Sequence, residues 1–466
     1  MQMSESILKK LKDLVKKDAW LTDLEDMYFY ITEWRDTLHG NPMIVLFPES
    51  TLEVSSIVKF CAKNKIEIVP QGGNTGLCGG AIPDDTGSQV IISLERLNKI
   101  RGISIEDQVI EVEAGCLLSN VQDQVTRKDF IFPIDMASSG SCQIGGNIST
   151  NAGGTNVLKY GSTRSQILGL EVVLPNGEIW NGISSLIKDN SGYDIKQLFI
   201  GAEGTLGIIT AASIKLYPAP SEIITLFLGI NNEEAIQFIL NNMRKKYKNN
   251  IETFELISKR ALKFATHFLP NINAPLMENY KYYLLIELSG ASTDELSSHL
   301  MSITNLGYIE DAVIAKNKTE QDALWLIRDS ISAAQKQQGL SFKHDISVPI
   351  GDVVSFINYA ENEVLKFLPN SRVVAFGHVG DGNIHFNVSQ PLSMTAEEFK
   401  NLKGEINKIV FDSAIGFGGS ICAEHGVGIL KKEDMLSYKT TIEISLMKAL
   451  KTSIDPDNIM NPGKIL

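Results

Sequence analysis

Two histidines flank an Asp-Gly turn signal within residues 376–386. If Asp381 and Gly382 form the two-residue loop of a β-hairpin, His378 lies opposite His385 on the paired strands. Directly opposed residues on one face of an antiparallel pair have Cβ atoms about 4.5–5.5 Å apart. This spacing predicts that the two imidazoles can bind one metal ion.

A carboxylate and an imidazole follow in a second glycine-containing segment, where Glu424 and His425 stand next to each other. Two histidines and one glutamate form a three-ligand metal set that leaves a position open for substrate. Such a set suits zinc and manganese alike. The alternative interpretation is that His378 and His385 are only polar residues of a surface hairpin.

Three glycine-rich loops, at residues 70–80, 140–154 and 201–210, could bind phosphate. Glycines let the backbone approach a ligand closely and direct successive N–H groups at its oxygens. The first loop is neither a P-loop nor a Gly-x-Gly-x-x-Gly turn that opens a helix. A single loop of this kind is an ordinary turn, but three of them, each with Ser, Thr or Asn, favour one long ligand such as a dinucleotide.

The elements that position these residues alternate between strands and helices. In the first half we expect strands at residues 43–47, 66–69, 90–94, 109–113, 170–174, 178–180 and 208–216, with a helix from Thr51. Pro218 and Pro220 then predict a domain boundary. In the second half we expect strands at 223–230 and 282–288, and helices at 233–247, 294–305, 319–338, 395–415 and 441–452. This pattern is typical of an α+β chain.

Composition excludes some classes of partner. The chain has 466 residues, a net charge of −12 and no arginine- or lysine-rich run beyond its amphipathic start, which argues against nucleic acid. The five cysteines, Cys61, Cys78, Cys116, Cys142 and Cys422, form no Cys-x-x-Cys pair and indicate reduced thiols. No apolar run approaches the ~18–20 residues of a membrane span.

The first 20 residues contain no signal-peptide core and read as an amphipathic helix. A helix packed on the body of the protein is favoured over a membrane anchor, so membrane contact is at most peripheral. Together these features predict a cytoplasmic protein.

The three loops, in this order, resemble the FAD-binding domain of the vanillyl-alcohol oxidase type. With His378, His385 and the 423–428 segment, the chain resembles the FAD-linked D-2-hydroxyacid dehydrogenases from about residue 40 to its end. The segments at 70–77 and 188–194 most resemble the D-2-hydroxyglutarate dehydrogenase branch. Some relatives attach FAD through a histidine in the first loop. Thr75 stands at about that point here, so the resemblance implies FAD held non-covalently.

The resemblance also implies roles for individual residues. His378, His385 and Glu424 match the ligands of a divalent metal, with zinc preferred to manganese, and His425 matches the catalytic base. Arg328, Ser332, Lys343 and Asn387 match substrate-binding positions, although the branch commonly has threonine where Ser332 stands. Residues implied to bind FAD are Pro70, Gly72, Gly73, Asn74, Thr75, Gly76, Ser141, Gly145, Gly146, Asn147, Thr150, Asn151, Gly153, Gly154, Glu203, Gly207, Ile208 and Asn461.

Part of this assignment follows from spacing alone. Arg328 and Ser332 are four residues apart on an expected helix and therefore share a face. An arginine can bind a carboxylate through two hydrogen bonds, although a helical arginine is often only a solvated surface residue. His344, beside Lys343, is interpreted as structural.

The sequence therefore predicts an α+β fold with a two-part FAD-binding domain, an α+β substrate domain and a C-terminal helical segment. We expect segments at 1–39, 40–219, 220–420 and 421–466, the last returning to the FAD site. The expected reaction is oxidation of a D-2-hydroxy acid, with D-2-hydroxyglutarate first, to the 2-oxo acid by hydride transfer to flavin N5. Alternatives are a D-lactate or glycolate dehydrogenase, or a non-catalytic flavin-binding subunit. The electron acceptor, an electron-transferring flavoprotein or a quinone, is left open, and so is a homodimer.

Overall fold

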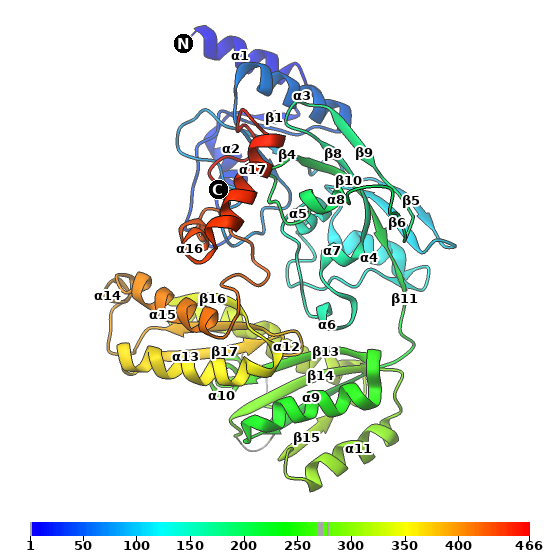
Figure 1. The fold of residues 1–466 in the computed structure, drawn as a ribbon, viewed down its shortest axis with the longest axis vertical. Helices are drawn as coiled ribbons and strands as arrows, with labels where there is room; N and C mark the ends of the chain where they lie inside the picture. The colour runs from blue at the N-terminus through cyan, green and yellow to red at the C-terminus, as the bar shows by residue number, and fades with distance from the viewer. Residues whose placement is uncertain (1, 269–273, 277–278) are drawn as a thin grey trace. The chain divides into compact units, whose positions relative to one another are not determined.

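The computed structural model describes residues 2–268, 274–276 and 279–466 (Figure 1). The chain divides into two compact units. Unit 1 consists of Met1–Gly154, Gly161–Ala219 and Glu424–Leu466, and unit 2 consists of Thr155–Tyr160 and Pro220–Ala423. The four expected segments stay a prediction, and each unit is described by itself.

Unit 1 contains a four-stranded sheet in the order β1-β2-β4-β3, in which β2, β4 and β3 run parallel and β1 is antiparallel to β2. The strands are β1 (Trp20–Leu21), β2 (Ile44–Leu46), β3 (Ile68–Gln71) and β4 (Val90–Ser93). The three residues of β2 and all four of β4 are buried. Their continuous apolar sequences are typical of parallel strands that are covered on both faces.

An antiparallel five-stranded sheet, in the order β5-β6-β10-β8-β9, forms the second part of unit 1. A two-stranded ribbon joins β11 to β7. These strands are β5 (Ile100–Ser104), β6 (Val109–Glu113), β7 (Phe130–Ile131), β8 (Ile167–Val173), β9 (Ile179–Gly182), β10 (Ile208–Lys215) and β11 (Tyr217–Pro218).

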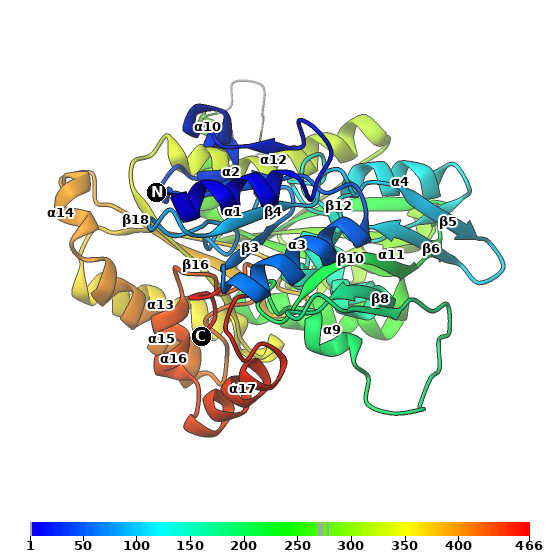
Figure 2. The same ribbon diagram turned by 90° about the horizontal axis from the view of Figure 1, so that it is seen from above.

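Among the helices of unit 1, α3 has Ser50 as its N-cap and contacts β8 (Figure 2). The helices are α1 (Gln2–Lys12), α2 (Leu24–Ile31), α3 (Thr51–Asn64), α4 (Leu118–Thr126), α5 (Ile144–Ser149), α7 (Thr163–Gln166), α8 (Lys196–Phe199), α16 (Lys432–Tyr438) and α17 (Thr441–Ile454).

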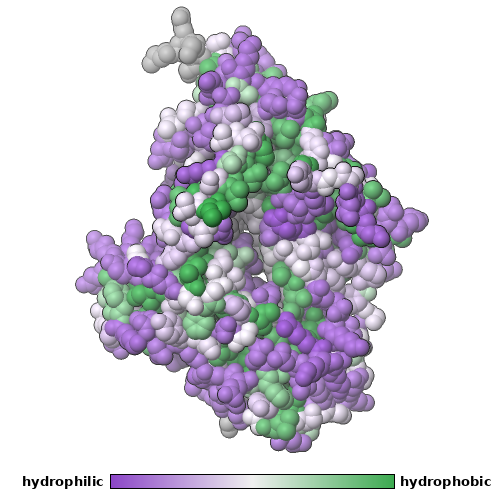
Figure 3. Space-filling view, in the orientation of Figure 1, coloured by the Kyte–Doolittle hydropathy of each residue, from purple (hydrophilic) through white to green (hydrophobic). Residues whose placement is uncertain are grey.

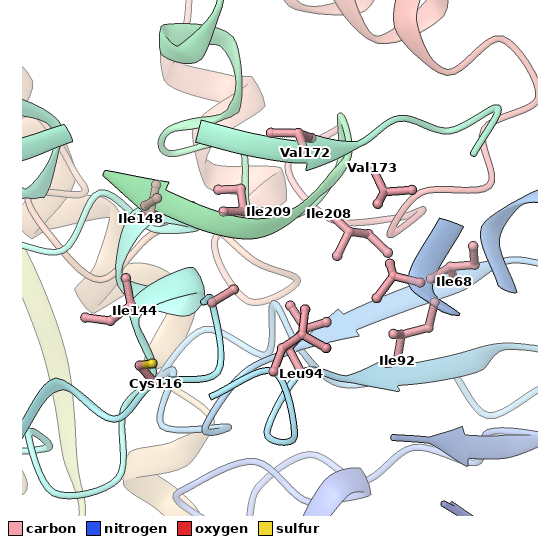
Figure 4. Packing of buried hydrophobic residues seen from close by; sticks show 14 of the residues in the cluster. Ile68, Ile92, Leu94, Cys116, Ile144, Ile148, Val172, Val173, Ile208 and Ile209 are labelled. Carbon is pink, nitrogen blue, oxygen red and sulfur yellow. The ribbon is translucent and has the colours of Figure 1, made fainter. Parts of the chain in front are cut away.

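One apolar core joins the two larger sheets of unit 1. Figure 4 shows Ile68 and Ile92 of the parallel sheet near Ile208 and Val173 of the antiparallel sheet, with Ile144 of α5 in the same cluster. All five side chains are at most 3% exposed. Close packing around the end of β3 and the start of α5 therefore fixes the first two glycine-rich loops relative to each other.

Unit 2 is built on an antiparallel seven-stranded sheet in the order β15-β12-β14-β13-β17-β18-β16. Its strands are β12 (Ile223–Ile230), β13 (Ile251–Ser258), β14 (Tyr282–Ser289), β15 (Asp311–Ile314), β16 (Ser341–Ser347), β17 (Arg372–Gly377) and β18 (Asn383–Ser389). Its helices are α6 (Val157–Tyr160), α9 (Glu233–Tyr247), α10 (Lys259–Phe268), α11 (Thr293–Asn305), α12 (Lys318–Lys336), α13 (Val353–Phe367), α14 (Ala396–Lys400) and α15 (Lys403–Gly416), with short 3-10 turns at Lys248–Asn250 and Ile350–Asp352.

The alternation of side chains across this sheet sorts its residues between two faces. Ile257, Val374 and Phe376 pack with residues of α10 and α12 in one core cluster. On the opposite face, Phe386 contacts Phe356 of α13. Side chains on the same face as Ile257, Val374 and Phe376 are those two residues away along a strand or directly opposite on the next strand. The side chains that therefore point to the side of α12 include those of Glu255, Lys343, Asp345, His385 and Asn387.

Most expected elements are confirmed, with shifts of a few residues at their ends. The single helix expected at 395–415 is wrong, because the chain leaves helical geometry at Leu402 and forms α14 and α15. Strand β13, which the sequence pattern did not predict, lies between β14 and β17 in the middle of the sheet of unit 2. The fold class is confirmed as a two-domain, mixed α+β fold.

No helix among the described residues combines the length and apolarity that crossing a bilayer requires. The face seen in Figure 3 is mainly hydrophilic, with apolar patches between the charged residues. Apolar atoms ordinarily contribute a large share of a folded protein's surface, so scattered patches of this kind need no further explanation.

Candidate active site

The three glycine-rich loops of unit 1 line one pocket. The first loop leaves the end of β3 at Gln71 and contributes residues 70–76. The second contributes Gln143 and much of α5, and the third contributes residues of 203–209. His425, from the C-terminal part of unit 1, lines the same pocket. Segments distant in sequence thus surround one space.

The backbone in this pocket is available to a ligand. Within the part of the chain that the structure describes, the amides of residues 72–76 donate no hydrogen bond to another protein group. A Cβ atom added at Gly76 or Gly146 would meet no atom within 4 Å, so both glycines border open space. By contrast, a Cβ at Gly73 would approach the carbonyl oxygen of Ser141 to 2.0 Å. Some glycines therefore keep the pocket open and others permit close loop packing.

An unsatisfied polar atom also points to a polar ligand. The Gln143 side chain is 7% exposed, and its Oε1 atom has no hydrogen-bond partner among the described residues. Buried polar atoms are usually paired, so such an atom beside a pocket is a binding candidate. The pocket therefore fits an elongated ligand that has both hydrogen-bond donors and acceptors.

Strained backbone gathers at the same place. Asn74, Asn151, Glu203 and Asn461 are non-glycine residues with φ angles between 43° and 50°. The left-handed conformation is uncommon for residues with a Cβ atom, and it persists where surrounding contacts hold it. Asn461 provides such contacts, since its Nδ2 donates to the carbonyls of Gly80 (2.8 Å) and Glu203 (2.7 Å).

The predicted cofactor residues separate into two groups. Those that line the pocket are Pro70, Gly72, Gly73, Asn74, Thr75, Gly76, Gly145, Gly146, Asn147, Thr150, Glu203, Gly207 and Ile208. Those that lie outside its lining are Ser141, Asn151, Gly153, Gly154 and Asn461. Asn151 accepts hydrogen bonds from Ser162 Oγ and the Arg164 amide, so it supports the second loop.

Glu203 holds the segment that carries His425. Its carboxylate accepts hydrogen bonds from the amides of Val427 (2.7 Å) and Gly428 (2.8 Å). Burial raises the pKa of Glu203, and these two donors oppose that shift by favouring the ionised form. The turn requires glycine at 428, where φ is +52° and a Cβ would lie 2.1 Å from the Cys78 carbonyl oxygen.

Glu424 and His425 lie side by side within unit 1. The His425 Nε2 atom is 3.7 Å from Glu424 Oε1, and the other Glu424 oxygen accepts a 3.3 Å hydrogen bond from the Gly154 amide. The second glycine-rich loop and the 423–428 segment are thus connected through a predicted metal ligand. His425 remains partly accessible, with 24% of its side chain exposed.

The expected hairpin register in unit 2 is wrong. Phe376, rather than His378, is the partner of His385 across β17 and β18. Strand β17 ends at Gly377, where φ is +140°, and the His378 carbonyl then accepts hydrogen bonds from the amides of Asp381, Gly382 and Asn383. The connection is a five-residue loop instead of a two-residue turn. The His378 and His385 rings nevertheless lie 5.6 Å apart between centroids.

A buried carboxylate that the sequence analysis missed supports this histidine pair. Glu255 of β13 is fully buried and accepts hydrogen bonds from His378 Nδ1 (2.5 Å) and Arg328 Nε (2.8 Å). Burial alone would raise the pKa of Glu255, but His378 and Arg328 outweigh it and lower the pKa to about 2. Arg328 is therefore paired with a carboxylate inside the protein.

Asp345 lies beside the second histidine. It is the cross-strand partner of His385, and its Oδ1 atom is 4.0 Å from His385 Nδ1. The Asn383 side chain donates a 2.9 Å hydrogen bond to the same oxygen. Asp345 and His385 can offer ligand atoms within 4.8 Å of each other. The histidines and their carboxylate neighbours form a donor set that fits a divalent cation.

The remaining predicted substrate residues form a separate group. Lys343 and Asn387 are cross-strand partners, and both donate a hydrogen bond to Gln335 Oε1. The distance from Asn387 Nδ2 to Gln335 Oε1 is 3.0 Å. Gln335 is fully buried, and its Nε2 atom has no partner among the described residues. Ser332 is exposed on α12. His344 bonds to the Phe386 carbonyl and to Asn407, as expected of a structural residue.

The chain matches two family models. The model "FAD binding domain" matches residues 42–182, and the model "FAD linked oxidases, C-terminal domain" matches residues 219–465. The pocket of glycine-rich loops lies largely within the first match, and the His378 and Glu424 segments lie within the second.

Similar proteins extend over nearly the whole chain. D-2-hydroxyglutarate dehydrogenase, mitochondrial, of Arabidopsis thaliana is 34% identical over 98% of this chain and 80% of its own length. D-2-hydroxyglutarate--pyruvate transhydrogenase of Saccharomyces cerevisiae is 35% identical over 95% of this chain and 90% of its own. The mitochondrial D-2-hydroxyglutarate dehydrogenase of Bos taurus is 36% identical over 100% and 84%.

Among solved structures, p-cresol methylhydroxylase with substrate bound superimposes with a TM-score of 0.78. The match covers 100% of this chain and 97% of that chain at 17% identity. At this identity the likeness establishes the fold alone.

The prediction of a cytoplasmic location is wrong by these comparisons. The similar proteins of Arabidopsis thaliana and Bos taurus are named mitochondrial, which contradicts the cytoplasmic prediction. Reduced cysteines and the lack of a signal-peptide core, on which the prediction rested, do not distinguish the cytosol from the interior of an organelle.

Proposed function

Because this chain belongs to the FAD-linked D-2-hydroxyacid dehydrogenases of the vanillyl-alcohol oxidase type, we propose that it oxidises D-2-hydroxyglutarate to the 2-oxo acid. The chain is an oxidoreductase with an FAD-binding domain, and its substrate is a small hydroxy acid. The identity of the acid, the role of a metal and the transfer of a hydride to the flavin are parts of the proposal.

The observation that carries the proposal is the position of His425. It lines the pocket that the three glycine-rich loops surround, so an imidazole borders the space available to the cofactor. A base in this position can take the proton of a substrate hydroxyl while the flavin is being reduced. A glycine-rich pocket without such a base would fit a flavin carrier equally well.

FAD fits the pocket by three features described above: unused amides at 72–76, open space beside Gly76 and Gly146, and an unsatisfied Gln143 oxygen. The loop residues would bind its phosphates and sugars non-covalently. When bound, FAD supplies the acceptor for the hydride that leaves C2 of the substrate. The chain's own contribution is to bind and orient the cofactor.

His425 acts as the general base in this proposal. Glu203 fixes its segment through Val427 and Gly428, so the imidazole is carried on a restrained turn. Restraint of this kind keeps a base in the geometry that proton transfer requires. His425 would accept the proton of the C2 hydroxyl and thereby favour departure of the hydride.

We assign a divalent cation, with zinc preferred, to His378, His385 and Glu424. Such an ion would lower the pKa of the substrate hydroxyl. The support within unit 2 is the proximity of the two imidazole rings and the hydrogen bond that ties His378 Nδ1 to Glu255. Histidines that bind metals commonly donate their second ring N–H to a carboxylate in this way.

Arg328, Ser332, Lys343 and Asn387 remain the proposed substrate-binding residues. Arg328 donates through Nε to Glu255 and lies with Nη2 3.4 Å from His378 Nε2, so its guanidinium borders the proposed metal ligand and adds positive charge for a carboxylate of the substrate. Lys343 of β16 donates a hydrogen bond to Gln335 of α12. Gln335 is seven residues after Arg328, which places it about 10 Å further along the helix axis. Two separated cationic groups favour a dicarboxylate over lactate, since each can attract one carboxylate of the substrate.

The runner-up function is oxidation of D-lactate or glycolate. An experiment that separates them measures anaerobic bleaching of the flavin by D-2-hydroxyglutarate, D-malate and D-lactate. We expect kcat/KM to fall in that order in the wild type and the preference for dicarboxylates to shrink in Arg328→Ala. A wild type that prefers D-lactate would contradict the substrate assignment, and no bleaching by any of the three would indicate a non-catalytic flavin protein.

The electron acceptor can be tested with the same reduced protein. An electron-transferring flavoprotein and a soluble quinone are the acceptors proposed from the family. Pyruvate is added because the yeast relative is named a transhydrogenase that uses it. The acceptor that restores the flavin absorbance fastest identifies the physiological class.

A further inference from the structure

Glu255 is not among the predicted site residues, yet it contacts two residues that are. It lies on β13, beside β17, with a fully buried side chain on the face of the sheet that α12 covers. Each of its two oxygens has its own partner. Oε1 accepts from His378 Nδ1, and Oε2 accepts from Arg328 Nε.

The first contact determines which ring nitrogen of His378 can bind a metal. An ionised carboxylate can only accept hydrogen bonds, so Nδ1 must carry the proton that this bond shares. The 2.5 Å separation therefore places the proton on Nδ1 and leaves the lone pair on Nε2. A neutral imidazole binds a cation through such a lone pair.

The second contact keeps a cation beside that lone pair. Arg328 Nη2 is 3.4 Å from His378 Nε2, and the guanidinium is further restrained over the Phe376 ring, 5.4 Å from its centroid. A metal ion at Nε2 and the guanidinium would repel each other. The negative charge of Glu255, shared between them, offsets this repulsion.

We propose that Glu255 is a positioning residue that fixes His378 as an Nε2 donor and allows a divalent cation to bind beside Arg328. The inference rests on the proposed metal dependence and names a residue for it that sequence motifs do not contain. Glu255 acts through His378 and Arg328 and is not expected to contact substrate.

A purely structural ion pair is the alternative, and it makes a different prediction. Removal of one partner from a buried pair destabilises the fold whether or not a metal binds. A positioning role additionally requires that metal affinity falls in protein that is still folded. Metal affinity of the purified flavoprotein, measured by titration with zinc and with manganese, therefore separates the two roles.

The main variant is Glu255→Gln, and Glu252→Gln is its matched control. Glu252 lies on the same strand, is 3% exposed and pairs with Lys159, so it reports the effect of removing a buried carboxylate from β13. We expect Glu255→Gln to weaken metal binding by about 10- to 100-fold, the usual effect of losing a carboxylate behind a ligating histidine. Glu252→Gln should bind metal as the wild type does.

Arg328→Met tests the direction of the electrostatic effect. It removes the neighbouring cation while Glu255 and His378 remain, so metal affinity should rise or stay unchanged. A loss as large as that of Glu255→Gln would overturn the inference, because Glu255 would then act only by holding Arg328.

A measurement on the metal-free wild type covers the case in which Glu255→Gln does not fold. Histidine ¹⁵N shifts, assigned by comparison with His378→Gln among the seven histidines, report the tautomer of each ring. We expect His378 to carry its proton on Nδ1. An Nε2 proton would overturn the inference.

Failure of the premise can be recognised separately. A wild type that binds neither zinc nor manganese contradicts the proposed metal dependence and the inference with it. A wild type that binds metal with the same affinity as folded Glu255→Gln contradicts the inference alone.

Discussion

The buried carboxylate of Glu203 accepts a 2.8 Å hydrogen bond from the backbone amide of Gly428. The two residues are 225 positions apart in sequence, and the contact joins the third glycine-rich loop to the turn that follows His425. The resemblance implied a cofactor-binding role for Glu203. Its two oxygens are instead occupied by protein amides, so the geometry favours a role in holding the proposed base.

Glu203→Gln should therefore affect His425 more than FAD. The amide replaces one acceptor oxygen with a donor that faces an N–H group, and an unsatisfied buried group costs about 1–3 kcal/mol. We expect a lower thermal midpoint and a roughly tenfold slower anaerobic flavin reduction, since about 1.4 kcal/mol corresponds to a factor of ten.

Glu113→Gln is the control for this variant. Glu113 belongs to the same unit, is 8% exposed and accepts a hydrogen bond from the Lys99 amide. Both residues are remote in sequence from residues 424–428. It should lose stability without a change in the rate of reduction. A Glu203→Gln protein that is reduced at the wild-type rate would show that the turn does not need this anchor.

Local signals in the sequence were sufficient to identify the glycine-rich loops that line one pocket. Glycines beside Ser, Thr and Asn mark the loops, because the backbone conformation of such a loop depends mainly on its own residues. Gly146 and Thr75 thus appear in the lining as expected. The same signals could not separate a residue that faces the pocket from one behind it, and Asn461 is an example of the latter, since it bonds to loop carbonyls.

The histidine pair shows where local reasoning fails. The Asp-Gly signal predicts a two-residue turn, but Gly377 allows the chain to turn before His378, and the His378 carbonyl collects three amides. Glu255 was missed with its whole strand, because β13 contains two buried glutamates among apolar residues and does not alternate clearly. Only the tertiary partners Arg328 and His378 explain a carboxylate in such a position.

Gly146→Val should prevent flavin binding without unfolding the protein. A Cβ at this position meets no protein atom within 4 Å, so the added side chain would occupy space that a ligand needs. Gly140→Val is the control, because Gly140 also has open space around it but does not line the pocket. Flavin content at 450 nm per protein should fall for Gly146→Val only, and full occupancy in that variant would refute the loop assignment.

The flavin should be released from denatured wild-type protein. Thr75 lines the pocket at the point where some relatives of this family attach FAD through histidine, and its hydroxyl cannot form that link. After acid precipitation, free FAD should appear in the supernatant and none in the pellet. Flavin that stays with the washed pellet would show a covalent bond at another residue.

His425→Asn should retain FAD and bound metal but slow flavin reduction by about 10²- to 10⁴-fold, the usual contribution of a general base. Asparagine keeps a hydrogen-bonding side chain at the pocket and cannot accept the proton. Stopped-flow reduction under anaerobic conditions measures the step directly. A rate equal to that of the wild type would exclude His425 as the base.

Lys464 should make the stability of unit 1 depend on pH in the alkaline range. Its side chain is 3% exposed, and burial, opposed by Asp84 and Glu67, lowers its pKa from 10.5 to about 8. Below pH 8 both the folded and unfolded chains carry the proton, and the folded state bears the full cost of the buried charge. Between pH 8 and 10.5 the unfolded chain binds more protons than the folded chain, so stability rises with pH, by at most about 1.4 kcal/mol per pH unit.

Lys464→Met removes this dependence. The variant should have the higher midpoint of guanidinium denaturation at pH 7, and its advantage over the wild type should shrink as the pH approaches 10. Denaturation curves at pH 7, 8, 9 and 10 give the free energy of unfolding of both proteins at each pH. In the difference between the two proteins, the contributions of groups that titrate in both cancel. A difference that does not change with pH would show that the lysine stays charged in the folded protein throughout this range, held by Asp84 and Glu67.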